Sequence, residues 1–206
     1  YATTTSIARL EDDYFNGATS QDGYGILSQR GTQFLWFLGV DDLSTIPALQ
    51  FTSADAEPSN IMSVVSVNRD LFAIKQKSTE IMYNGGDATT PFVRDASGFM
   101  EVGTLASDSI AKDQTSVYML GDDSRVWRIA GRQPMPISTE GIDDLIAQES
   151  YTSQRQAVGA VINYRGRNEY VLTFNGLTIA YDTTTGLWHE KKSFGMDTWR
   201  ARGHCV

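Results

Sequence analysis

The sequence predicts an all-β fold in which one unit of about 45 to 54 residues repeats. Two observations point to β-structure. Short apolar segments alternate with turns rich in Gly, Asn and Asp, which is typical of strands joined by hairpins. Four stretches also share one layout, in which an apolar strand, a polar turn and a second strand with an aromatic residue follow one another. These stretches are Ile26–Phe37, Leu71–Tyr83, Val117–Trp127 and Tyr170–Tyr181.

Each of the four stretches has a turn signal between its two strands. Gly, Asn and Asp tolerate the backbone conformations that tight turns need, and Asn-Gly is the strongest hairpin signal of this kind. We therefore expect four hairpins, the clearest of them at Asn175-Gly176. The four turn segments are Gln29–Gly31, Lys75–Lys77, Gly121–Asp123 and Asn175-Gly176.

The spacing of these stretches is the third observation. Equivalent apolar positions recur at steps of 45, 46 and 54 residues, and these positions are Ile26, Leu71, Val117 and Val171. Four-stranded sheets that repeat about every 40 to 50 residues are the signature of β-propellers. The sequence therefore predicts a β-propeller-like fold with roughly four blade-like units in this chain. A meandering β-sandwich is the alternative, although nothing in a sandwich requires this step.

One segment, near residues 139–148, has helical periodicity. Its apolar residues fall at positions i, i+3 and i+4, and polar residues that can cap a helix precede them. The residues concerned are Ser138, Thr139, Ile142, Leu145 and Ile146. We expect one short helix that covers the edge of a blade.

The chain has 206 residues, of which 17 are Lys or Arg and 25 are Asp or Glu, so its formal charge is −8. We expect residues 1–206 to form a single β-propeller domain or the central fragment of a longer protein, because the chain starts at Tyr1 and ends in a strand-like segment.

The longest apolar run, Phe34–Val40, is far shorter than the roughly 20 residues that cross a bilayer. The acidic balance disfavours binding to phosphates. Neither a membrane nor a specific nucleic acid is an expected partner.

Residues that carry catalysis or hold cofactors are not evident. The two histidines, His189 and His204, lack the ligand spacing of a metal site, and we expect a structural or surface role for His189. Cys205 has no evident base near it in the sequence. The sequence contains no Gly-x-Ser-x-Gly elbow and no phosphate-binding glycine loop. We therefore predict no catalytic, cofactor-binding or metal-binding residues, and no cofactor.

Carboxylates occur as four adjacent pairs, which could suggest a glycosidase or a calcium site. Neighbours on a strand point to opposite faces, so adjacency does not bring two carboxyl groups together. None of the pairs continues into the alternating pattern of a calcium loop. Turn formation is the better explanation for all four pairs. The pairs are Asp12-Asp13, Asp41-Asp42, Asp122-Asp123 and Asp143-Asp144.

Two compositional biases indicate surfaces rather than pockets. Arg outnumbers Lys by 12 to 5, and Arg is the cation enriched in protein interfaces. Loops such as Arg165–Arg167 and Gly131-Arg132 are candidate contacts, although a solvated turn explains each of them as well. The four tryptophans lie in or beside the second strands of the repeat, where we expect them to form blade core. They are Trp36, Trp127, Trp188 and Trp199.

An ordered series of segments resembles a bacteriophage family. The segments follow one another as Asn68–Ile74, Lys77–Asp87, Pro91–Arg94, Glu101–Ile110, Leu120–Trp127, Ile137–Thr139, Asp182–Glu190 and Arg202–Cys205. In order and spacing they resemble the packaged-DNA stabilisation proteins of short-tailed phages, which are tail hub or nozzle proteins. The resemblance covers about Asp22 to Cys205, although members of the family are roughly twice as long as this chain or longer.

The resemblance implies a non-enzymatic, structural function in the virion. Such proteins dock below the head-to-tail adaptor, close the portal and stabilise the packaged DNA. The implied partners are the adaptor, a tail needle, a tailspike or fibre, and further copies of the same protein in a ring. The implied location is the phage tail, with assembly in the host cytoplasm. The net charge of −8 would keep DNA from adhering to such a conduit.

Two other functions use the same fold. A carbohydrate- or protein-binding propeller would expose aromatic side chains at one rim. A propeller glycosidase, the less favoured of the two, would need two carboxyl groups about 5 to 9 Å apart across a cleft.

Overall fold

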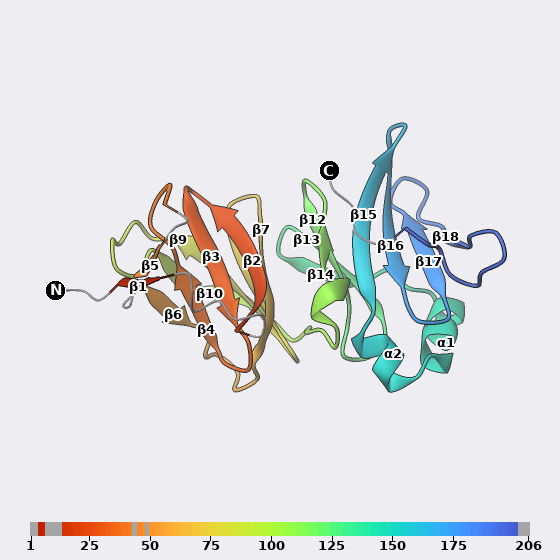
Figure 1. Cartoon of the computed structure of the whole chain (residues 1–206), viewed down its shortest axis with the longest axis horizontal. Helices are drawn as coiled ribbons and strands as arrows, with labels where there is room; N and C mark the ends of the chain where they lie inside the picture. The colour runs from red at the N-terminus through yellow and green to blue at the C-terminus, as the bar shows by residue number, and fades with distance from the viewer. Residues whose placement is uncertain (1–3, 7–13, 43–44, 48–49, 202–206) are drawn as a thin grey trace. The chain divides into compact units, whose positions relative to one another are not determined.

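The computed structural model describes residues 4–6, 14–42, 45–47 and 50–201 (Figure 1). The sequence features at Asp12-Asp13, His204 and Cys205 lie outside these residues. The described part of the chain is dominated by four antiparallel sheets of four strands each. Each sheet is built from strands that are close in sequence, as the blades of a propeller are. The predicted β-propeller-like fold with four blade-like units is confirmed.

The first sheet contains β2 (Phe15–Gln21), β3 (Tyr24–Gln29), β4 (Phe34–Phe37) and β6 (Phe51–Ser53). The second contains β7 (Ile61–Val67), β8 (Asp70–Lys75), β9 (Thr79–Asn84) and β10 (Phe92–Met100). The third contains β11 (Ala111–Lys112), β12 (Ser116–Leu120), β13 (Val126–Ala130) and β14 (Gln133–Pro136). The fourth contains β15 (Val158–Tyr164), β16 (Arg167–Thr173), β17 (Thr178–Asp182) and β18 (Trp188–Glu190). Two further short strands, β1 (Thr4–Ser6) and β5 (Thr45–Pro47), pair with each other.

The four predicted hairpins are the central strand pairs of the four sheets. They are β3–β4, β8–β9, β12–β13 and β16–β17. The tightest turns, however, join the first two strands of a sheet. Asp22-Gly23 and Arg165-Gly166 both have positive φ at the two turn residues, which is the type I′ geometry that matches the strand twist. Asn175-Gly176 lacks positive φ, and its hairpin is closed by a hydrogen bond from Phe174 N to Leu177 O of 2.7 Å.

The chain divides into two compact units, unit 1 (Tyr1–Thr104) and unit 2 (Leu105–Val206). Unit 1 contains the first and second sheets, and unit 2 contains the third and fourth. Each unit has a core that draws apolar side chains from both of its sheets. In unit 1 the core residues are Ile26, Leu35, Phe37, Ala54, Ile61, Val64, Leu71, Ala73, Met82 and Phe92. In unit 2 they are Ala106, Tyr118, Leu120, Val126, Ile146, Ala157, Tyr170, Leu172, Phe174 and Ile179.

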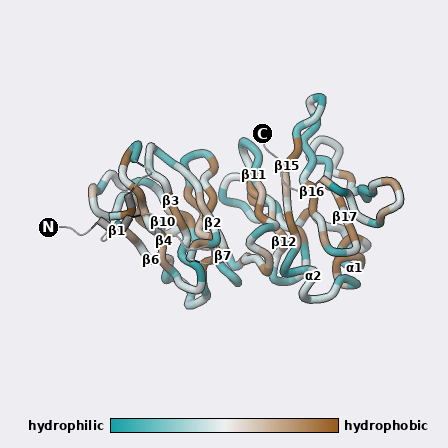
Figure 2. Tube along the Cα trace, in the orientation of Figure 1, coloured by the Kyte–Doolittle hydropathy of each residue, from teal (hydrophilic) through white to brown (hydrophobic). Residues whose placement is uncertain are grey.

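Apolar residues follow the strands and polar residues follow the turns, as Figure 2 shows. The large aromatic side chains in the two cores are phenylalanine and tyrosine. All four tryptophans are only half-buried, and Trp188 packs against the edge of the unit 2 core. None of the four is a fully buried core residue, so the expectation that they form blade core holds only for the contact made by Trp188. The indole N–H explains this placement, because it needs a hydrogen-bond acceptor that apolar core lacks. Trp188 donates to Ile137 O at 2.9 Å, and Trp36 donates to Gln29 Oε1 at 2.8 Å.

The predicted helix is α1 (Glu140–Gln148), which buries Ile146 in the core of unit 2. Thr139 occupies its N-cap position but makes no side-chain capping bond, and Ser138 Oγ instead accepts from Val126 N at 3.0 Å. A second helix, α2 (Tyr151–Arg155), was not expected because five residues are too few to show a period. No helix in the described ranges combines the length and the apolar character needed to cross a bilayer.

A buried ion pair joins β8 to β9 in unit 1. The side chains of Lys75 and Glu80 are both 0% exposed, and Lys75 Nζ lies 3.1 Å from Glu80 Oε1. The same ammonium group donates to Ala54 O at 2.8 Å and to Glu57 O. Glu80 Oε1 also accepts from Ala56 N at 3.1 Å. The pair therefore fastens the segment after β6 to the second sheet, although the sequence places Lys75 at the start of a polar turn.

Candidate interaction surfaces

The acidic excess of the chain is concentrated in unit 1. Residues 1–104 contain 13 acidic and 6 basic residues, whereas residues 105–206 contain 12 and 11. The formal charges of the units are therefore −7 and −1. A surface in each unit has the open shape and the unpaired charge of a contact site.

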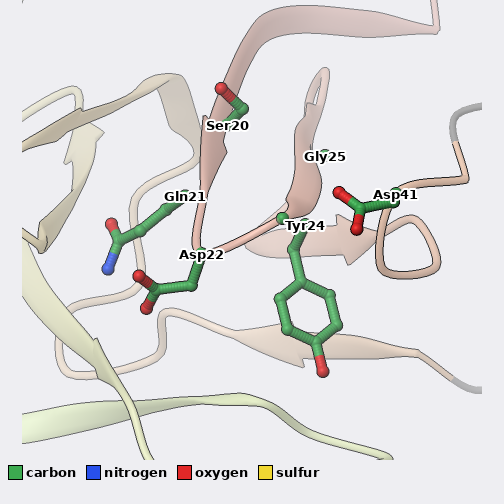
Figure 3. Close-up of a pocket in the computed structure, with 7 residues that line it drawn as sticks. Ser20, Gln21, Asp22, Tyr24, Gly25 and Asp41 are labelled. Carbon is green, nitrogen blue, oxygen red and sulfur yellow. The ribbon is translucent and has the colours of Figure 1, made fainter.

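The surface in unit 1 is a pocket of about 490 Å³ at the β2–β3 turn, which we call the acidic pocket (Figure 3). Its lining consists of Ser20, Gln21, Asp22, Gly23, Tyr24, Gly25 and Asp41. Asp22 follows the end of β2, and Asp41 comes from the turn after β4. The two carboxylates and the Tyr24 ring are the chemically distinctive groups of the pocket.

The β2–β3 turn is held in place by its neighbour in the second sheet. Gln21 Nε2 donates to Arg69 O at 2.7 Å, and Gln21 Oε1 accepts from Ser66 Oγ at 2.7 Å. Asp22 accepts from Asn84 Nδ2 at 3.0 Å and lies 3.4 Å from Arg69, whose side chain is 82% exposed. The ion pair is worth little at that exposure, so the buried amide of Gln21 does most of the positioning.

Asp41 is less constrained electrostatically than Asp22. Its N–H donates to Gly23 O at 2.9 Å, which brings the turn after β4 beside the β2–β3 turn. Among the described residues, no ion pair joins the Asp41 carboxylate. Tyr24 packs its ring edge-on against Phe92, with the centroids 5.9 Å apart. The pocket therefore has a fixed aromatic wall and one uncompensated negative charge.

The surface in unit 2 lies at the β15–β16 hairpin. The last strand pairs of this hairpin, Asn163↔Asn168 and Tyr164↔Arg167, lie beyond the end of its pairing with β17. The tip therefore projects from the sheet, as Figure 1 shows, and it is hydrophilic in Figure 2. The Tyr164 side chain is 65% exposed, and the Arg165 guanidinium lies 5.1 Å from its ring centroid.

A pocket of about 400 Å³ lies beside this hairpin. Together with Arg165 we call it the basic hairpin surface, and its pocket is lined by Ile162, Asn163, Tyr164, Arg167, Glu169, Lys191 and Trp199. Lys191 is neutralised by an ion pair with Glu169 and lies 5.0 Å from the Trp199 ring centroid. Arg165 and Arg167 form no ion pair with any described residue. The Arg167 charge also acts on the Asp182 carboxyl and helps to lower its pKa. The surface therefore combines aromatic walls with two guanidinium groups, of which that of Arg165 has no carboxylate partner among the described residues.

Two of the acidic pairs, His189 and the Gly131-Arg132 loop were singled out from the sequence, and they lie in different parts of unit 2. Asp123 accepts from Arg125 N and from the Trp127 indole, as expected for a turn. Asp143-Asp144 lies inside α1, so the turn explanation is wrong for that pair. His189 is on the surface, 3.8 Å from Glu169. Gly131-Arg132 forms the turn between β13 and β14.

Within the described ranges, no three His, Cys, Asp or Glu side chains gather in a way that could hold a metal ion. The acidic pocket itself was missed by sequence reasoning. Its one local signal was Asp22-Gly23, a type I′ turn sequence.

The turn between β17 and β18 shows why one of the resembling segments begins with aspartate. Asp182 Oδ1 accepts from Thr184 N at 2.8 Å and from Thr185 N at 3.3 Å. Gly186 has a φ of 73° and donates its N–H to Asp182 O at 2.8 Å. The bond from Thr184 N, helped by the amide and hydroxyl of Thr185, holds the pKa of the Asp182 carboxyl below its ordinary value.

This lowered pKa predicts a pH-dependent stability. A carboxylate with a depressed folded pKa stabilises the fold above its unfolded pKa of about 3.9, and this contribution is lost as pH falls through the folded pKa. We expect the unfolding midpoint of Asp182→Asn to lie below that of the native chain near neutral pH, and the two to converge at acidic pH. Chemical denaturation along a pH series measures this. The control is Asp197→Asn in an exposed turn, and a gap for Asp182→Asn that did not change with pH would contradict the prediction.

Four successive meander sheets define a protein of the β-propeller class. Comparison with solved structures agrees on the fold. The chain is similar to virginiamycin B lyase from Staphylococcus aureus, with a TM-score of 0.54 and 11% identity over 96% of this chain and 61% of that one. It is also similar to the extracellular domain of a putative hybrid two component system from B. thetaiotaomicron, with a TM-score of 0.52 and 12% identity over 92% of this chain and 23% of that one. The chain thus spans less than two thirds of the length of either.

The family model described as "Bacteriophage P22 Gp10, beta-propeller" matches residues 10–206, so the chain belongs to this phage stabilisation family. The resemblance based on the ordered segments is confirmed. The chain is a bacteriophage structural protein with a β-propeller fold. Comparison with curated proteins gives no match.

Proposed function

We propose that the chain is part of a tail hub that docks below the head-to-tail adaptor, closes the portal and stabilises the packaged DNA. The observation that carries this proposal is the match of the phage stabilisation family over residues 10–206. The sheets support it physically, because a propeller is a rigid scaffold whose loops can be varied for docking. The acidic pocket at the β2–β3 turn and the basic hairpin surface at the β15–β16 turn both lie at such loops.

The proposal includes partners and a location. The adaptor, a tail needle, a tailspike or fibre and further copies of this protein in a ring are the contacts we propose. The protein assembles in the host cytoplasm and acts in the tail of the virion, without catalysing a reaction. Residues 1–206 are, in this proposal, the central fragment of a longer propeller protein.

Charge supports the role of a conduit. The formal charge of −7 on unit 1 repels a polyanion, so DNA can pass without adhering to this part of the protein. The chain should therefore not bind duplex DNA at about 0.15 M salt, where phosphate contacts would otherwise dominate. Binding at that salt concentration would contradict this part of the proposal.

The experiment that tests the function measures DNA release from packaged phage heads that lack their late tail proteins. We expect the protein to slow the release of DNA, measured as nuclease-accessible DNA against time. The control is the same quantity of an unrelated acidic β-propeller protein. An unchanged leak in the presence of folded protein would refute the proposed function.

A further inference from the structure

The acidic pocket presents a negative charge that unit 1 does not neutralise. Asp41 has a φ of 54°, in the left-handed region, which aspartate tolerates better than most residues. Its carboxylate has no ion-pair partner among the described residues. Asp22, on the same rim, is paired only with the exposed Arg69 at 3.4 Å. Both residues line the acidic pocket, on either side of Tyr24, and Figure 3 shows the Asp41 carboxylate directed toward Tyr24 and the Asp22 carboxylate directed away from it.

The basic hairpin surface presents the opposite charge. Arg165 occupies the first position of a type I′ turn with a φ of 52°, where Asn, Asp or Gly is less strained than Arg. The turn itself does not need a guanidinium group, so this backbone strain indicates a function for the side chain. Arg167 lines the neighbouring pocket, and its charge acts on the Asp182 carboxyl without forming a close ion pair with it. The exposed Tyr164 ring lies against Arg165 and adds apolar area.

We propose that the basic hairpin surface of one copy binds the acidic pocket of a second copy of this chain. Arg165 and Arg167 would pair with Asp41 and Asp22, and the Tyr164 ring would lie against the wall formed by Tyr24. This inference rests on the proposed function, because it names the surfaces through which copies of the hub protein meet.

Complementary charge favours a second copy as the occupant. The two patches carry opposite charges, and Asp41 in one and Arg165 in the other have no ion-pair partner among the described residues. Each patch lies in a different unit of the same chain. A pocket of about 490 Å³ is large enough to take an arginine or tyrosine side chain. Two different patches on identical copies make a heterologous contact, which repeats from copy to copy and closes into a ring when the rotation allows.

The test uses two variants that remove charge without disturbing the turns. The acid-free variant is Asp22→Asn/Asp41→Asn, since Asn also tolerates the left-handed backbone at both positions. The arginine-free variant is Arg165→Asn/Arg167→Gln, and Asn suits the type I′ turn better than Arg does. The matched control is Arg155→Gln on α2, where an arginine also lies over an exposed tyrosine, with 5.9 Å between Arg155 Cζ and the Tyr151 ring centroid.

Sedimentation velocity over a concentration series measures self-association. We expect the native chain to associate at about 50 mM salt and to dissociate at about 500 mM, where charges are screened beyond a few ångströms. Each of the two charge-removing variants should raise the dissociation constant by about tenfold or more, because paired interfacial charges contribute strongly. The Arg155→Gln control should associate like the native chain.

Mixing the two variants gives the sharpest result. The acid-free variant keeps an intact basic hairpin surface, and the arginine-free variant keeps an intact acidic pocket. A mixture should therefore form a one-to-one dimer and nothing larger, at concentrations where each weakened variant alone remains monomeric. An internal contact between the two surfaces of one chain would not be restored by mixing.

Three results would overturn the inference. They are a native chain that stays monomeric at all concentrations, variants that associate like the native chain, and a mixture that forms no dimer.

The DNA-release experiment separates failure of this inference from failure of the proposed function. If a monomeric native chain still slows DNA release, the contact between copies is wrong and the structural function stands. If the native chain associates as expected but does not slow release, the proposed function is wrong.

Discussion

Replacing Lys75 with methionine is expected to lower the free energy of unfolding by about 3 to 5 kcal/mol. The reason is that Glu80, whose side chain is 0% exposed, would keep a buried carboxylate with no cation beside it. Glu80 Oε2 is already buried without a hydrogen-bond partner, so the site has no spare donor to replace the ammonium group. The carbonyl oxygens of Ala54 and Glu57 would also lose their donor. Chemical denaturation monitored by tryptophan fluorescence measures the change.

A control and a second variant make this prediction specific. Lys77→Met removes an exposed lysine two residues away and should change stability by less than about 0.5 kcal/mol. The double variant Lys75→Met/Glu80→Gln removes both charges and should recover part of the loss, because an uncompensated charge costs more than a buried amide. If Lys75→Met changed the free energy of unfolding as little as Lys77→Met, the ammonium group would not be buried as described.

The second large effect is expected at Gly159 in β15. A Cβ at this position would overlap the carbonyl group of Ser109 in the 3₁₀ turn η2 (Ser107–Ser109), and it would lie 3.0 Å from the Tyr170 ring. The obstacle is backbone, and the Tyr170 hydroxyl holds it in place by donating to Ser109 O at 2.7 Å. Gly159→Ala should therefore destabilise the fold by about 2 to 3 kcal/mol, in the range of overpacked cores.

Gly141 provides the matched control for Gly159. It lies in the first turn of α1, where a Cβ would meet nothing within 4 Å. Gly141→Ala should raise stability by about 0.5 kcal/mol, because alanine favours helix and restricts the unfolded chain. Thermal unfolding of the two variants should shift in opposite directions. A shift in the same direction would contradict the close approach of β15 to η2.

Local patterns in the sequence determined the framework of this protein. Hairpins, the repeat of about 45 to 54 residues and the helix α1 depend on residues close together in the chain, so apolar periodicity and turn residues predict them. The phage family was likewise recognisable from the order of short segments. The short helix α2 and the preference of tryptophan for half-buried positions were not, since neither leaves a periodic signal.

Only the tertiary structure decided which charged residues are buried, paired or free. Lys75 is in a polar stretch of sequence, yet it is buried because the segment after β6 supplies two carbonyl acceptors and β9 supplies Glu80. Asp22 and Asp41 share a pocket although they are far apart in the chain. The solvation and pairing of a charge depend on neighbours brought together by sheet pairing, and sequence distance does not record those neighbours. For the same reason the structure, rather than the composition, locates the acidic pocket and the basic hairpin surface.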